Sequence, residues 1–101
     1  MQQMMKQAQA LQRKLAKAQE ELADTEVSGQ AGGGMVTAVV RGGGDEVKSI
    51  AINPEAVDAD DVELLQDMVV AAVNEALRAA KAIEQQKLGS LAGGLGLPGM
   101  F

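Results

Sequence analysis

Apolar residues recur with helical spacing over the first 22 residues of the chain. They are Met4, Ala8, Leu11, Leu15, Ala18 and Leu22. Their spacings alternate between four and three, a period of about 3.5 that predicts a helix packing against another helix along one seam. We therefore expect a first helix over about residues 3–24.

Three segments with strand patterns follow this helix. In residues 25–30, Thr25 and Val27 alternate with polar neighbours, which predicts a short strand. Residues 35–41 are rich in Val and predict the clearest strand. Residues 46–52 are its expected hairpin partner across a glycine-rich turn. The segments together predict an antiparallel sheet.

A second long helix is expected after the sheet. Asp60 followed by Glu63 has the spacing of a helix N-cap with an acidic partner. Helical periodicity continues to about Leu88, and Gly89 is the expected stop. The order helix, three strands, helix predicts an α+β fold, αβββα.

The expected helices are longer than the strands. They would measure roughly 33 and 42 Å, against about 23 Å for a seven-residue strand, so both should extend beyond the sheet and pair there. We expect one domain over residues 1–88 and a flexible Gly- and Leu-rich tail over 89–101.

The middle strand has apolar residues on both faces. Met35 and Val39 fall on the face opposite Val36, Ala38 and Val40. The helices of one chain cover only one face well, and a core without aromatic residues buries little area. Met35 and Val39 are therefore predicted to contact a second copy in a homodimer.

Charge is segregated along the chain. Residues 1–19 carry four positive charges and no acid, whereas the whole chain has a net charge of −5. Basic residues on one face of a helix are often simply solvated, but ordinary solvated faces mix both signs. Charge alone leaves two readings open: a face that is simply solvated, or one that binds a polyanion mainly through its phosphates. The predicted main contacts are Lys6, Arg13, Lys14 and Lys17, with Arg78, Lys81 and Lys87 as secondary contacts. Lys17 is also spaced to pair with Glu21 along the helix.

Other chemistry finds little support in the sequence. The chain has no Cys and no His, so its Ser and Thr hydroxyls lack an activating partner, and no catalytic residue is predicted. The glycines at 32–34 and 42–44 join strands rather than opening a helix, which favours turns over a phosphate loop. The acids between Glu55 and Glu63 lack the pattern of a calcium loop. We expect neither metal nor cofactor, and no small-molecule substrate.

No segment is apolar enough to span a membrane, and the N-terminus lacks the apolar core of a signal peptide. We therefore expect a cytoplasmic protein. The near absence of aromatic residues also disfavours single-stranded nucleic acid, whose bases need stacking platforms.

Several motifs together resemble the YbaB/EbfC family. They are the Met-Met-Lys-Gln-Ala-Gln run at 4–9, the strands within 29–52, the segments 61–65 and 69–76, and the Gly-Gly-Leu-Gly-Leu-Pro-Gly run at 93–99. The resemblance covers essentially the whole chain, although Val73 stands where that family often has Phe. It implies a bacterial nucleoid-associated protein, a tweezer-like homodimer that binds double-stranded DNA, with roles in nucleoid organisation and gene regulation. It supplies no catalytic motif and no fixed base-reading residue.

A second class of function stays open from the residues alone. The helical seam and the Met-rich start of the chain could instead hold partner polypeptides, as in an interaction scaffold or small chaperone.

Overall fold

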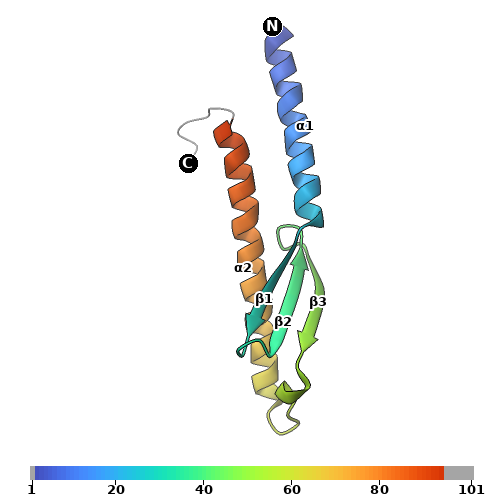
Figure 1. Cartoon of the computed structure of the whole chain (residues 1–101), viewed down its shortest axis with the longest axis vertical. Coiled ribbons are helices and arrows are strands. Elements are labelled where there is room, and N and C mark those ends of the chain that lie inside the picture. The colour runs from blue at the N-terminus through green and yellow to red at the C-terminus, as the bar shows by residue number, and fades with distance from the viewer. Residues whose placement is uncertain (1, 95–101) are drawn as a thin grey trace.

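The computed structural model describes residues 2–94, with side chains as far as Leu91. In chain order, the elements are α1 (Gln2–Asp24), β1 (Glu26–Ala31), β2 (Val36–Arg41), β3 (Glu46–Ile52), the short 3-10 helix η1 (Pro54–Ala56) and α2 (Val62–Gly94). The predicted αβββα order is confirmed. The molecule is elongated, with extents of 69 × 24 × 15 Å, and both helices run beyond the same end of the sheet (Figure 1).

The three strands form one antiparallel sheet in the order β1-β2-β3. Ala38 of β2 pairs with Gly29 of β1 on one side and with Ile50 of β3 on the other. The register shifts between Val39 and Val40, where β3 has one extra residue. Three consecutive glycines with positive φ, at 32–34, form the β1–β2 turn, a conformation that residues with a Cβ rarely adopt.

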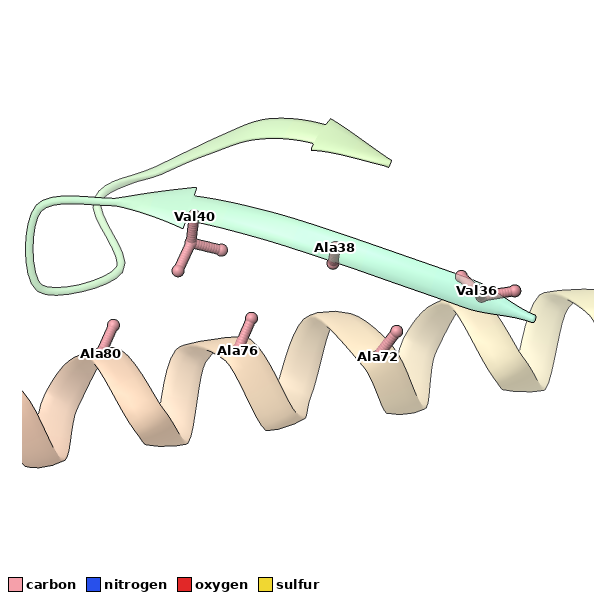
Figure 2. Packing of buried hydrophobic residues seen from close by; sticks show 6 residues of the cluster. All are labelled: Val36, Ala38, Val40, Ala72, Ala76 and Ala80. Carbon is pink, nitrogen blue, oxygen red and sulfur yellow. The ribbon is translucent and has the colours of Figure 1, made fainter. Parts of the chain in front are cut away.

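The core lies between α2 and one face of the sheet. Ala72, Ala76 and Ala80 repeat at a spacing of four along α2 and face the sheet. They pack against alternate residues of β2, namely Val36, Ala38 and Val40 (Figure 2). The small alanines let the helix approach closely, and it approaches β1 most closely at Gly29. A Cβ there would lie 2.5 Å from the Ala72 carbonyl oxygen.

The seam of α1 is covered only near the sheet. Ala18 and Leu22 are buried, and Leu15 is half-buried. Farther along, Met4 is 72% exposed. The two helices pack at the sheet end of α1, so most of its first half is a free arm (Figure 1).

Both predicted boundaries of the second helix are wrong. The cap is Asp61 rather than Asp60, because the Asp61 carboxylate accepts a hydrogen bond from the Leu64 backbone N–H at 3.3 Å. The helix also continues through Gly89 to Gly94. An interior glycine costs a helix only about 1 kcal/mol, and half-buried Leu88 and Leu91 continue the packing beside it. Of the predicted tail, residues 95–101 lie outside the described residues.

Candidate nucleic-acid interface

The first part of α1 is a positively charged, exposed arm. We call residues 2–19 the basic arm: it carries Lys6, Arg13, Lys14 and Lys17 and no acid. All four side chains are exposed. Lys6, Arg13 and Lys17 are spaced seven and four residues apart, which places them on one side of the helix. That side lies about half a turn around the helix from the apolar seam. The basic arm can therefore present charge without disturbing its packing.

None of the four cations of the basic arm forms a salt bridge within residues 2–94. The Arg13 Nε donates a long hydrogen bond of 3.4 Å to the Gln9 carbonyl oxygen of the same helix. This contact leaves the two terminal nitrogens of the guanidinium directed to solvent. Paired terminal nitrogens are the part of Arg that binds phosphate oxygens most effectively.

The two cations of the sheet share one acid, which compensates part of their charge. Lys48 on β3 and Arg41 on β2 both form ion pairs with Glu26 on β1. The hydrogen bond from Lys48 lowers the pKa of Glu26. These two residues are consequently poor candidates for an anion site, although they are as basic as those of the arm.

The secondary cations do not form one group with the basic arm. Only Lys87 is brought beside α1, where it borders the same open cleft as Lys14 and Lys17. Arg78 and Lys81 are exposed but lie nine and six residues before Lys87, roughly 14 and 9 Å down the axis of α2. The structure thus extends the basic surface from α1 onto α2 only at Lys87.

Lys87 forms an ion pair that the sequence did not predict. Its Nζ lies 2.5 Å from Oε2 of Glu21, which links the two helices. The predicted partner of Glu21 was Lys17, one turn away on the same helix, and the structure pairs Glu21 with Lys87 instead. The hydrogen bond and charge of Lys87, with a smaller contribution from Lys17, lower the pKa of Glu21.

Met35 and Val39, the two predicted contacts with a second copy, are not among the most exposed apolar side chains of the sheet, which lie on β3. Val39 is half-buried on the outer face of the sheet, where its register neighbours are Ser28 and Ser49. Met35 is half-buried in the turn just before β2. Their contact with a partner stays a prediction.

The acids between strand β3 and helix α2 bind backbone groups. Asp58 accepts a hydrogen bond from the Asp60 N–H at 2.9 Å, and Asp61 caps α2. Within residues 2–94 no three metal-binding side chains come together, and no helix is long and apolar enough to cross a membrane.

Comparison with known proteins identifies the family of this fold. Residues 1–95 match the YbaB/EbfC DNA-binding family. The chain belongs to that family. Among curated proteins, a nucleoid-associated protein of Saccharopolyspora erythraea is 56% identical over 99% of this chain and 93% of its own length. Another from Streptomyces avermitilis is 57% identical over 99% of this chain and 90% of its own.

The fold has a solved counterpart. The crystal structure of an uncharacterised Helicobacter pylori protein matches with a TM-score of 0.76 over 92% of this chain and 97% of that one, at 20% identity. This YbaB/EbfC protein therefore shares its fold with the Helicobacter protein. The family is one of DNA-binding proteins rather than enzymes.

Proposed function

We propose that this YbaB/EbfC protein binds double-stranded DNA at the nucleoid in the cytoplasm, mainly by contacts between the basic arm and backbone phosphates. The observation that carries the proposal is the arm itself, which holds four exposed cations without an ion pair among the described residues and without an acid. Family membership supports DNA as the ligand. The main contacts are Lys6, Arg13, Lys14 and Lys17, and the secondary contacts are Arg78, Lys81 and Lys87.

The net charge of −5 does not prevent such binding. The acids begin at Glu20, where α1 meets the sheet, and half of them lie in the sheet and in the turns that follow its strands. The first turns of α1 extend away from that region (Figure 1). At ordinary ionic strength, charges farther than about 10 Å are largely screened. A phosphate at the tip of the arm therefore interacts mainly with the cations of the arm.

Phosphate contacts predict a steep dependence of DNA affinity on salt. If a dimer engages about four to eight phosphates, the logarithm of the association constant should fall against the logarithm of salt concentration with a slope of roughly −4 to −7. Fluorescence anisotropy with a labelled duplex at several NaCl concentrations measures this slope. A slope near zero, or no binding at low salt, would contradict the proposal.

The protein is further proposed to act as a homodimer, so that two basic arms reach one duplex. The support is an exposed apolar surface on β3, which we call the β3 patch: Val47, Ile50 and Ile52 are 45, 41 and 39% exposed. These residues lie on the core face of the sheet, but α2 packs over β1 and β2 and leaves them uncovered. An isolated monomer would leave this surface in water.

The β3 patch adjoins an apolar row on α2. Val69, Val73 and Leu77 repeat at a spacing of four, and all three are half-buried. Leu77 lies beside the β2–β3 turn, where its Cδ2 is 3.0 Å from the position of a Cβ on Gly44. The row therefore approaches β3 at the β2–β3 turn, and we propose that it contacts the second copy together with the patch.

Replacing Ile50 with Asp tests this interface. The charge would be desolvated in the dimer without a partner, so the dimer should dissociate. Light scattering at micromolar concentration should show about 20.8 kDa, twice the 10.4 kDa chain, for the parent and about 10.4 kDa for the variant.

Val39→Asp is the comparison for Ile50→Asp, because it places the same charge on the outer face of the sheet. Circular dichroism should first show that both variants remain folded. Dissociation of Val39→Asp with an intact Ile50→Asp dimer would contradict the β3 patch and place the interface at Val39, as the sequence predicts.

A role as a polypeptide-binding scaffold or small chaperone is the second candidate. It is favoured by the exposed Met-rich start of α1, where Met4 on the seam and its neighbour Met5 are 72 and 64% exposed. The two functions use opposite sides of the same helix. Replacing Met4 and Met5 with Gln should leave the affinity for duplex DNA unchanged if phosphate binding is the function. Roles in nucleoid organisation and gene regulation would follow from that DNA binding.

A further inference from the structure

An open cleft of about 380 Å³ lies between the helices α1 and α2. Lys14 and Lys17 of α1 and Lys87 of α2 line it, together with the Ser90 hydroxyl group, and Glu21 is the one acid among its lining residues. Three ammonium groups and a hydroxyl group on one small cleft form a set of hydrogen-bond donors suited to an oxyanion.

The cleft already contains an oxyanion of the protein. The Glu21 carboxylate forms its ion pair with Lys87 at 2.5 Å, with the two side chains 49 and 33% exposed. Both groups are therefore within reach of solvent and of a ligand. A carboxylate and a phosphate diester offer an ammonium group the same kind of charged oxygen, so that Glu21 occupies the position of a phosphate at Lys87.

We propose that the cleft between α1 and α2 binds a backbone phosphate of DNA and that Glu21 is its built-in competitor, which holds Lys87 and keeps that ammonium group from the phosphate. The inference rests on the proposed function and adds a site to it. In the ground state Lys87 is neutralised, so that it contributes little to DNA binding until Glu21 is released. Glu21 is charged at neutral pH already at the ordinary pKa of a Glu, and Lys87 lowers its pKa further.

The test is Glu21→Gln compared with Glu20→Gln in duplex-DNA titrations over a range of salt concentrations. Both variants remove one negative charge from adjacent exposed positions, but no salt bridge of the described residues involves Glu20. Glu21→Gln should free Lys87 in each chain. The salt slope of the DNA association constant should then become steeper by about 0.9 per chain, and the affinity should rise by about eightfold per chain at 0.1 M salt. Glu20→Gln should leave the slope unchanged.

A double-mutant cycle then ties the gain to Lys87. In a Lys87→Met background, the effect of Glu21→Gln should fall to that of Glu20→Gln, since no cation is left to release. A purely structural role for the ion pair would lower thermal stability in Glu21→Gln and leave the salt slope unchanged. Equal slopes for Glu21→Gln and Glu20→Gln would overturn the inference.

Two further experiments distinguish free phosphate from DNA phosphate as the ligand, and distinguish failure of this inference from failure of the proposed function. Sodium phosphate at matched ionic strength should shift the backbone amide resonances around Lys87 less than a short duplex does. A larger response to free phosphate, with no effect of Glu21→Gln on DNA binding, would assign the cleft to the free ion and overturn the inference. Failure of the parent protein to bind duplex DNA at low salt would instead remove the proposed function itself.

Discussion

Replacing Arg13 and Lys17 together with Glu is expected to lower the affinity for duplex DNA by about 60-fold per arm at 0.1 M salt, and to abolish detectable binding when both arms of a dimer are affected. Each phosphate contact contributes about 0.9 to the salt slope, which corresponds to roughly eightfold in affinity at 0.1 M. Two lost contacts therefore give about 60-fold. The reversal also changes the charge of the arm from +4 to zero, since two cations are lost and two acids are gained.

The fold should survive this change. Both side chains are exposed and lie opposite the apolar seam, so no packing is removed. The acid at position 17 lies about one turn from both Glu20 and Glu21, and each of these like-charge pairs costs a few tenths of a kcal/mol. Circular dichroism should give the helix content of the parent. Anisotropy with the same duplex measures the loss of affinity.

The matched control is Arg78→Glu with Lys81→Glu, which changes the net charge by the same amount on α2. These positions are exposed but remote from the basic arm. A smaller loss of DNA affinity and a smaller change in the salt slope are therefore expected. Full salt-sensitive affinity in the Arg13 and Lys17 variant, with loss in the Arg78 and Lys81 variant, would show that DNA contacts α2 rather than the arm.

Much of the fold could be predicted because its signals are local. Residues 46–52 were predicted with their observed bounds, since alternation and a glycine-rich turn define a hairpin within a few residues. The end of α2 could not be predicted in the same way. Gly89 is a local stop signal, but Leu91 borders the cleft beside α1, and such tertiary contacts outweigh the intrinsic preference of one glycine.

In the candidate site, too, local features could be predicted from the sequence and tertiary contacts could not. Exposure of Lys6, Arg13 and Lys17 could be predicted, because helical spacing alone sets them opposite the seam. The pairing of Glu21 with Lys87 could not, since it joins residues 66 positions apart (87 minus 21) and depends on how closely α1 and α2 approach. The exposed β3 patch was missed for a related reason. The lateral position of α2 on the sheet decides which strands it covers. The alternation of residues in β3 does not encode that position.

That lateral position depends on one residue of β1. Gly29 is buried directly beneath α2, and a Cβ there would lie 2.5 Å from the Ala72 carbonyl oxygen and 2.9 Å from the Ala76 Cα atom. Helix backbone cannot move aside as a flexible side chain can. Any larger residue at this position must lift α2 from the sheet and separate Ala72 and Ala76 from Val36 and Ala38.

Gly29→Val is therefore expected to destabilise the protein by about 3 kcal/mol or more, at the upper end of overpacking effects. For a domain of this size, that corresponds to a fall in the melting temperature of roughly 12–24 °C. Ser28→Val is the control, because it introduces the same side chain one position earlier, where residue 28 is exposed on the outer face of β1. Thermal unfolding followed by circular dichroism should be compared at one protein concentration, since the stability of a dimer depends on it. If Gly29→Val melts within a few degrees of Ser28→Val, then α2 does not lie as close to β1 as the core described here requires.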